Sequence, residues 1–300
     1  PWLLGSLPRR PGEQFHSVQT RRIWTILGPV QLRRCYFRGP NGGRFPLDEW
    51  LGLHRLYTPA VAQLMCWTGA MESSFEHASE TLRRCAGLAT PGRQIQRVVN
   101  DCGPGAARWM DQRPAPRRLV PVEVLNIQTA LTGIPARPEE LQNIKGRQPD
   151  GSAKTRPIKV GCVFTQTLNA QGHPDRNPAS TTYLSGFRDP VDFGLRLRTE
   201  ASTQSKNAWP RLPRPFTKSS MTRWTLPQNA HRMDDPSFQK RGFFIGSGVV
   251  EGSCRHIVAQ RTQLSGLRWL LSGAENVLHF RSLIKSNLFD DFCRQTPLAA

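Results

Sequence analysis

The sequence predicts a mixed α/β protein: a β-hairpin near the N-terminus, a helical region, a sheet, and a C-terminal helical segment. Three patterns support this fold class. β-favouring runs flank Gly28-Pro29, helical periodicity covers residues 57 to 112, and apolar runs of strand length recur between residues 119 and 187. A chain of 300 residues is long enough to bury a sizeable core and to divide into two or three units.

The first element is the run RRIWTILGPVQLRRCYFR, residues 21 to 38. Gly28-Pro29 predicts the turn of a hairpin, and Arg33 and Arg34 give its second strand a basic face. The turn-rich residues GPNGGRFP then end this piece. We therefore expect a hairpin region over residues 1–48 that contacts DNA through the two arginines.

Residues 49–115 form the predicted helical region. Thr58-Pro59 is typical of a helix start, and apolar residues recur at Val61, Leu64, Met65 and Trp67. Two more helices are predicted, with Gly87 as the break between them. The stripe expected to be buried on the first of them consists of Phe75, Ala78, Leu82 and Cys85.

The second of these helices has polar side chains opposite its apolar stripe. Ile95, Val98 and Val99 form the stripe, and Thr90-Pro91 precedes the helix. Two interpretations remain open. The pair of helices is either a helix-turn-helix whose second helix contacts DNA, or an ordinary helical hairpin with a solvated face. In the first interpretation the DNA-binding residues are Arg93, Gln94, Gln96 and Arg97.

Residues 116–200 contain three runs that predict strands, LVPVEVLNIQ, IKVGCVFTQT and STTYLSGF, in an order compatible with a mixed sheet. Residues 201–230 are basic and proline-rich and predict an irregular connection. Its Trp209 and Trp224 either stack on bases or pack locally. Residues 231–300 are predicted to be helical from about Ser247 to Phe292, with breaks near residues 265–266 and 272–273.

The composition is strongly basic. Lys and Arg number 41 against 22 Asp and Glu, a formal net charge of +19 that favours a polyanionic partner such as nucleic acid. The seven cysteines include no C-x-x-C pair, which fits reduced thiols better than a disulfide framework or a zinc cluster. No apolar run is long enough to span a bilayer, and the start PWLLGSLPRR has neither an initiator Met nor a signal-peptide pattern. We expect a cytoplasmic protein, and the chain is compatible with a fragment.

Several ordered stretches resemble the ISKra-type insertion-sequence transposases. They cover most of the chain apart from its start and the 201–228 region. The matching stretches are GPVQLRR, RFPLDEWLGL, YTPAVAQLMCWTGA, TGIPARPEEL, KGRQPDGSAKTR, KVGCVFTQT, STTY, NAHRM, FFIGSGVVEGSC, GLRWLLSGAENVLHFRSLI and FDDF.

This resemblance implies a DDE enzyme with an RNase H-like core. In such an enzyme carboxylates hold Mg²⁺ ions that catalyse phosphoryl transfer at the DNA ends of a transposon. It also implies transposon-end DNA as partner, allows a homo-oligomer, and suggests association with a bacterial-type nucleoid.

The chain departs from the family pattern at two of the three expected carboxylates. The family's D-G-T-G-[VI]-P motif, expected just past the first core strand, reads ALTGIP here, so Ala130 occupies the first Asp position. The block with the second Asp is missing after Glu200. Only Glu251 remains in its motif, where the resemblance makes it the catalytic residue and a metal ligand. We therefore expect an internally truncated copy without catalytic activity.

Glu251 also has a purely structural interpretation. A carboxylate in a first helical turn complements the helix dipole, Ser247 is a candidate cap, and Arg255 lies four residues on, within reach of an ion pair. The sequence offers no replacement ligand for the missing carboxylates among four other acids: Glu123, Asp150, Asp234 and Asp235.

Three hypotheses therefore stand. The chain is an inactive, transposase-derived protein; or residues 21 to 112 form a DNA-binding module without chemistry; or the chain is a translated pseudogene without stable structure.

Overall fold

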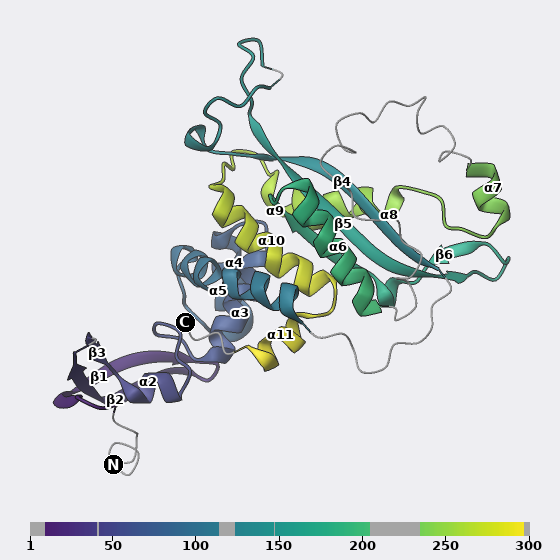
Figure 1. Cartoon of the computed structure of the whole chain (residues 1–300). Helices are drawn as coiled ribbons and strands as arrows, with labels where there is room; N and C mark the ends of the chain where they lie inside the picture. The colour runs from purple at the N-terminus through teal and green to yellow at the C-terminus, as the bar shows by residue number, and fades with distance from the viewer. Residues whose placement is uncertain (1–9, 41, 114–123, 147, 205–234, 297–300) are drawn as a thin grey trace. The chain divides into compact units, whose positions relative to one another are not determined.

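The computed structural model describes residues 10–40, 42–113, 124–146, 148–204 and 235–296 (Figure 1). They form two compact units. One contains the residues up to Gly105 and those from Asp290 on, and the other runs from Ala106 to Phe289. The chain is thus a mixed α/β protein with two antiparallel sheets.

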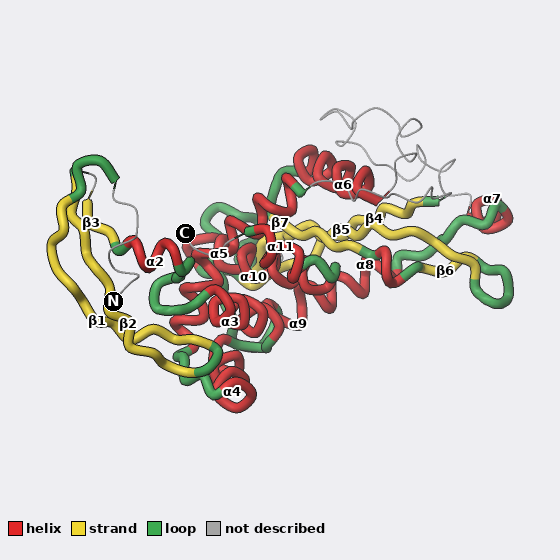
Figure 2. Tube along the Cα trace, turned by 90° about the horizontal axis from the view of Figure 1, so that it is seen from below, coloured by secondary structure: helices red, strands yellow, loops and turns green. Residues whose placement is uncertain are grey.

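The first unit begins with a long β-hairpin. Strand β1 (Gln14–Thr25) pairs antiparallel with β2 (Gly28–Gly39), and the short β3 (Gly42–Arg44) adds to β2. Figure 2 shows β1 and β2 running side by side to a closed turn. Thr25 pairs with Gly28, so the turn consists of two residues only.

The hairpin prediction is confirmed, but its turn lies at Ile26 and Leu27, ahead of the predicted Gly28-Pro29. Gly28 has a φ of 109°, a conformation that glycine adopts without the steric cost other residues have. Gly28 is therefore the first residue after the turn, and the apolar residues Ile26 and Leu27 form the tip of the hairpin.

Helices follow the hairpin in this unit, and their starts agree with the sequence signals. Pro59 is the first residue of its helix, and the Ser74 hydroxyl accepts a hydrogen bond from the amide of His77 at 3.0 Å as an N-cap. The helices are α2 (Pro46–Trp50), α3 (Pro59–Met71), α4 (Phe75–Ala86), α5 (Gly92–Gln112) and α11 (Phe289–Gln295). The part of α5 from Ala106 on and the first residue of α11 belong to the second unit.

The predicted apolar stripes are confirmed in part. Ala78 and Leu82 of α4 are buried, but Cys85 is exposed, and Leu88 is buried in its stead. Gly87 adopts the left-handed conformation with φ 64°, and the amide of Leu88 donates to the carbonyl of Leu82 at 3.1 Å. This reversal ends α4 and turns the chain inward one residue after the glycine. On α3, Val61 and Met65 are buried, whereas Leu64 and Trp67 are exposed.

The second unit contains a four-stranded sheet. Its strands are β4 (Leu125–Pro135), β5 (Thr155–Leu168), β6 (Pro174–Arg176) and β7 (Thr182–Gly186). Every pairing is antiparallel, with β5 between β4 and β7. The expected mixed sheet is wrong because no crossover helix separates β4 from β5, and a parallel pair needs such a crossover.

Helices cover both faces of β5. Helix α6 (Pro190–Gln204) lies on one face, where an added Cβ on Gly161 would meet Leu197 at 2.6 Å. The segment that follows α7 (Asp235–Lys240) lies on the other face, where the rings of Phe164 and Phe244 stand 5.5 Å apart. The middle of β5, Ile158 and residues 160–164, is therefore buried, as its apolar sequence predicts.

The C-terminal region is helical, as predicted, with one of its two breaks. Its elements are α8 (Gly248–Ser253), a π-helix (Cys254–Ala259), α9 (Gln260–Thr262) and α10 (Leu271–Lys285). The break near Ser265-Gly266 is confirmed. The one at 272–273 is wrong, because both residues lie in the first turn of α10, whose Leu271 amide donates to Glu140 at 3.1 Å. Helix α10 lies along β7, where the hydroxyls of Ser185 and Ser282 are 3.1 Å apart.

The prediction of an irregular connection is wrong for its first four residues. Residues 201–204 belong to α6, a helix the sequence reasoning missed although Asp189-Pro190 is a helix-start signal. Asp189 accepts from the amide of Val191 at 2.8 Å. The rest of the connection, with Trp209 and Trp224, lies outside the described residues.

Candidate nucleic-acid interface and the region of Glu251

The predicted DNA-binding residues of α5 lie on its outward face. Ile95, Val98 and Val99 are fully buried, which fixes the rotation of the helix. On the other side Arg93, Gln96 and Arg97 are exposed, and Gln94 is half-buried. The sequence pattern thus predicted both faces of this helix correctly.

The start of α5 is held close to α4. A Cβ added to Gly92 would lie 2.8 Å from both the carbonyl carbon and the carbonyl oxygen of Phe75. The hydroxyl of Ser79 donates to the carbonyl of Thr90 at 2.6 Å. Close contact and hydrogen bond together set the position from which Arg93 projects.

The arginines of α4 differ from those of α5. Arg83 and Arg84 both bind Glu80, and these hydrogen bonds, that from Arg83 foremost, lower the pKa of Glu80 to about 2. Within the residues that the structure describes, Arg93 and Arg97 form no ion pair. Their charges are therefore available to an external anion.

Only one of the two predicted arginines of the hairpin is accessible. Arg33 is exposed, but Arg34 is 2% exposed, binds Asp48 of α2, and lies 3.7 Å over the ring of Phe45. Burial and then the charge of Arg21 lower its pKa. The prediction for Arg34 is thus corrected, because alternate strand residues face opposite sides and its side is covered by α2.

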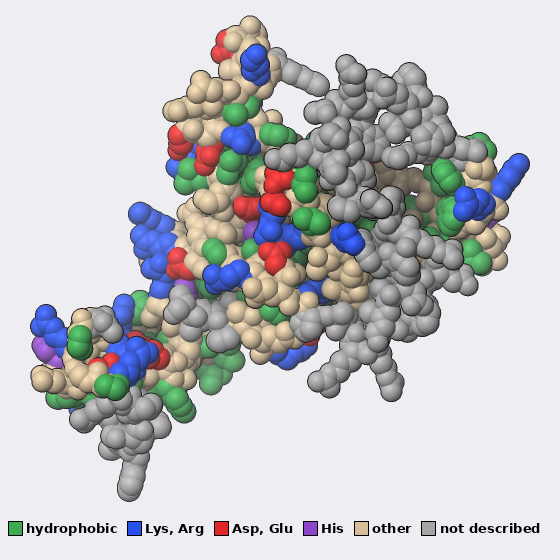
Figure 3. Space-filling model, viewed as in Figure 1, with side chains coloured by type: hydrophobic (Ala, Val, Ile, Leu, Met, Phe, Trp, Pro, Cys, Tyr) green, Lys and Arg blue, Asp and Glu red, His purple; other side chains and the backbone are tan. Residues whose placement is uncertain are grey.

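Three further arginines of the hairpin are exposed but were not predicted as DNA-binding residues from the sequence. Arg21, Arg22 and Arg38 are exposed, and the guanidinium of Arg22 lies 4.9 Å from the ring centroid of Trp24. Figure 3 shows blue basic side chains next to green apolar ones on the part of this unit at the lower left. The signal was present in the sequence, since residues 14 to 47 include no Asp or Glu.

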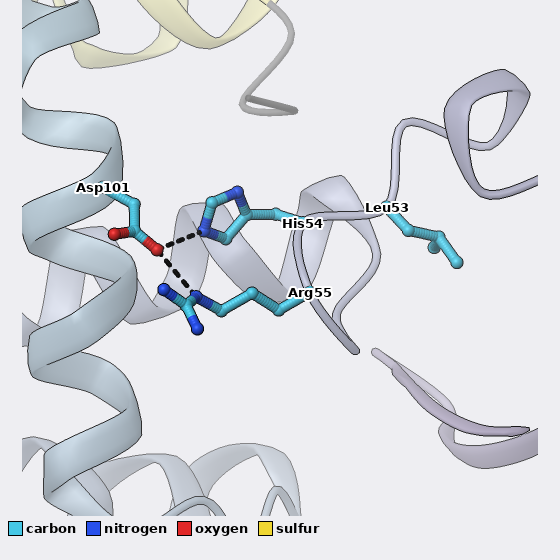
Figure 4. Close-up of a pocket in the computed structure, with 4 residues that line it drawn as sticks. All are labelled: Leu53, His54, Arg55 and Asp101. Carbon is cyan, nitrogen blue, oxygen red and sulfur yellow. Dashed lines mark hydrogen bonds and ion pairs between the residues drawn. The ribbon is translucent and has the colours of Figure 1, made fainter. Parts of the chain in front are cut away.

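A hollow of about 440 Å³ lies between the loop before α3 and helix α5 (Figure 4). Asp101 of α5 accepts from Nε of Arg55 at 2.7 Å, and His54 Nε2 lies 3.2 Å from the same carboxylate oxygen. Burial raises the pKa of Asp101, but the hydrogen bonds and charges of Arg55 and His54 lower it by more. We interpret this cluster, which the sequence reasoning missed, as a clamp that holds the loop on α5.

Glu251 is exposed in the first turn of α8. The hydroxyl of Ser247 donates to its carboxylate, so Ser247 contacts the acid instead of capping a helix amide. The predicted ion pair with Arg255 does not form, because no carboxylate lies within salt-bridge distance of that guanidinium among the described residues.

Ala130 lies inside β4, paired with Val160, and not past the end of the strand as expected. It shares a strand face with Gln128, which contacts the segment that carries Glu251, and with Thr132, whose hydroxyl accepts from Gln263 just after α9 at 2.9 Å. The Gln128 amide donates to the Gly246 carbonyl at 2.7 Å and accepts from the Val250 amide at 3.2 Å. The strand with Ala130 therefore adjoins the start of the Glu251 helix.

The described residues do not fit the magnesium centre that the resemblance implies. Such a centre needs several oxygen donors, but Ala130 offers a methyl group and both polar atoms of Gln128 are engaged by backbone. No group of three or more His, Cys, Asp or Glu in this part of the chain could hold a metal ion. Asp150 is a turn former, since it accepts from the Ser152 amide at 2.9 Å. Glu123, Asp234 and the side chain of Asp235 lie outside the described residues.

Among the described residues, no helix combines the length and the apolar character needed to cross a bilayer. No protein-family model matches the chain, and a search of curated proteins gives no match.

Proposed function

We propose that this chain is a DNA-binding protein derived from an ISKra-type insertion-sequence transposase, and that it binds duplex DNA through its N-terminal unit. The observation that carries the proposal is the outward face of α5. Arg93 and Arg97 are exposed, have no ion-pair partner among the residues that the structure describes, and flank the exposed amide of Gln96 on a helix whose other face is buried. Arginine and glutamine side chains suit phosphates and base edges.

In this proposal α4 and α5 act as a helix-turn-helix. The connection between them is five residues long, from Gly87 to Pro91, and the second helix begins where Gly92 packs on the first. Arg93 and Arg97 are four residues apart and lie on neighbouring turns of one face. An α-helix of this kind fits the DNA major groove with its N-terminal residues toward the bases.

We further propose that the chain binds DNA without cleaving it. The resemblance assigns cleavage to Mg²⁺ held by several carboxylates. Support for the absence of cleavage comes from Ala130, which stands at the first ligand position, and from Glu251, whose carboxylate binds Ser247. An intact relative would combine the same DNA-binding surface with a complete set of carboxylates.

Fluorescence anisotropy with a labelled duplex of about 20 base pairs tests the binding, over NaCl concentrations from about 50 to about 300 mM. Affinity should fall steeply with salt. The double variant Arg93→Gln/Arg97→Gln should bind more weakly, with a salt slope smaller by about 1.8, because two phosphate contacts are lost.

Arg83→Gln/Arg84→Gln is the matched control. It removes the same charge from α4, but from arginines that Glu80 already engages, so its effect should be clearly smaller. The proposal fails if the wild-type chain does not bind at the lowest salt, or if the two double variants bind equally.

Incubation of the duplex carrying transposon ends with Mg²⁺ or Mn²⁺ tests the chemistry. No strand cleavage is expected, and Glu251→Ala should leave the DNA affinity unchanged. Cleavage that disappears in Glu251→Ala would overturn the proposed lack of activity.

A further inference from the structure

The tip of the β1–β2 hairpin exposes apolar side chains. Leu27 is 94% exposed and Ile26 is 54% exposed, and Val30 next to them is 47% exposed. Leu27 has the largest exposure among the exposed large apolar residues of the described chain. A turn between two strands normally carries polar residues, so this tip differs from an ordinary solvated turn.

The turn that presents these side chains is held in place. The Thr25 hydroxyl accepts from the Leu27 amide at 3.1 Å and donates to the Gly28 carbonyl at 2.9 Å. Just before the turn, the Trp24 amide donates to Leu56 at 2.7 Å, and the Trp24 carbonyl accepts from Thr58 at 3.0 Å. Ile26 and Leu27 therefore project from a fixed base, and little conformational freedom is lost when they enter a partner.

Positive charge lies along both strands behind the tip. Arg22 and Arg33 lie on one face of the hairpin, since Arg33 pairs with Thr20 and Arg22 lies two residues on. Arg21 is exposed on the other face, and none of the three forms an ion pair with the residues described. Because no acidic residue occurs between positions 14 and 47, the hairpin favours an anionic partner, and its apolar tip favours one that can accept an apolar side chain.

We propose that the hairpin is a second DNA-contacting element whose Ile26–Leu27 tip inserts between base steps of the minor groove and kinks the duplex. This inference rests on the proposed function and adds the groove and the deformation to it. Leu and Ile are side chains that minor-groove proteins insert in this way, and flanking arginines bind the adjacent phosphates. A second copy of the chain is a poor occupant, since two proteins of net charge +19 repel each other.

The base of the tip adjoins the start of α5. Trp24 is bonded on both sides of Tyr57, and Tyr57 is buried next to Thr90, two residues before Gly92. Within this unit, contacts of Trp24, Tyr57 and Thr90 thus link the base of the hairpin tip to the start of α5. In the proposed complex, a duplex held by α5 also contacts the hairpin.

The experiment uses the full chain and a duplex labelled at both ends for energy transfer, with 2-aminopurine at successive positions. Binding by the wild type should bring the ends closer and raise the 2-aminopurine fluorescence at one base step. The variant Ile26→Ser/Leu27→Ser should still bind but lose most of both signals. Val18→Ser, an exposed apolar residue on β1 away from the tip, should keep both signals.

The arginine variant Arg22→Gln/Arg33→Gln separates charge from insertion. It should reduce the salt slope by about 1.8 and still bend the duplex once bound. Both tip residues are exposed, so the tip variant should unfold at the wild-type temperature. If it does not, Leu27→Ala alone serves as the test.

Three results would overturn the inference. Wild-type binding without bending or unstacking removes the wedge but leaves the proposed function intact. A tip variant that bends DNA as the wild type does has the same consequence. Loss of binding to phosphatidylserine vesicles in the tip variant, with bending unchanged, would identify the tip as a membrane contact instead. Absence of any DNA binding at low salt would instead contradict the proposed function itself.

Discussion

At the scale of single residues, Gly92 determines how closely α5 approaches α4. We expect Gly92→Ala to lower the free energy of unfolding by about 1–3 kcal/mol. The new Cβ would lie 2.8 Å from backbone atoms of Phe75, and neither helix backbone can move away without losing packing. Urea unfolding followed by circular dichroism measures the effect.

Gly105 provides a control in the same helix. A Cβ at Gly105 meets nothing within 4 Å, so Gly105→Ala should raise stability by roughly 0.5–1 kcal/mol through the better helix propensity of alanine. Equal stability of the two variants would show that α5 does not depend on this close contact.

His256 makes the second unit sensitive to acid. Burial lowers the pKa of its imidazole, and the positive charges of Lys285, Arg281 and Arg176 lower it further. The unfolded chain therefore binds this proton more tightly than the folded one. The stability that depends on neutral His256 is fully present above the unfolded pKa of about 6.5, and it is lost as the pH falls below that value.

We expect the free energy of unfolding to decrease from pH 7 to pH 5, and to decrease less in His256→Gln. Urea unfolding at both pH values measures this difference. His173→Gln, at an exposed position, is the control and should follow the wild type. An identical pH dependence in wild type and His256→Gln would contradict the role of His256.

Single residues also show where sequence reasoning stops. The faces of α5 were predictable because Ile95, Val98 and Val99 set a helical period. The burial of Arg34 was not predictable. Arg33 and Arg34 are adjacent and face opposite sides of the strand, and which side is buried depends on where α2 packs. The position of Ala130 inside β4 likewise depends on strand register, which a pairing 30 residues away sets at Val160.

At the scale of elements, the π-helix Cys254–Ala259 depends on one side chain. Arg281 of α10 is 1% exposed and donates through Nε to the Ile257 carbonyl at 2.7 Å. The same guanidinium donates to the His256 carbonyl and reaches Gln260 at 3.4 Å. Burial lowers its pKa to about 10, which leaves it charged at neutral pH.

Arg281→Met should destabilise this unit by about 2–4 kcal/mol, because it removes the hydrogen bonds that a buried guanidinium donates to the carbonyls of Ile257 and His256. Urea unfolding measures the loss, and hydrogen exchange should report faster opening across residues 254–259. Arg255→Met, at an exposed position on the same segment, should change little. A stable Arg281→Met variant with unchanged exchange would show that the π-helix holds without the guanidinium.

Elements with local signals were predicted and those without were not. Helix α3 starts at Pro59 and strand β5 follows its apolar run, because proline geometry and burial act over a few residues. The hairpin turn was misplaced because Gly28-Pro29 is a stronger turn signal than Ile26 and Leu27, which form it. The antiparallel arrangement of the sheet could not be predicted, since the relative direction of two strands depends on pairing partners far apart in sequence.

At the scale of the whole molecule, the net charge of +19 acts on folding and on binding in opposite directions. Like charges repel within a compact chain and lower its stability, and salt screens that repulsion. The same salt weakens DNA binding, because releasing the counterions of the phosphates gains less free energy when the salt concentration of the solution is higher. Stability and affinity should therefore change with opposite sign over one range of ionic strength.

We expect the urea midpoint of unfolding to rise between about 20 and about 300 mM NaCl, since the Debye length falls well below the size of a unit over this range. Urea is the denaturant of choice because guanidinium would itself screen the charges. Duplex DNA added at low salt should raise the midpoint as well. At a DNA concentration a hundredfold above Kd, the free energy of unfolding should increase by about 2.7 kcal/mol. A midpoint that falls with added salt would mean that the ion pairs, such as those of Glu80, stabilise the fold by more than the excess positive charge destabilises it.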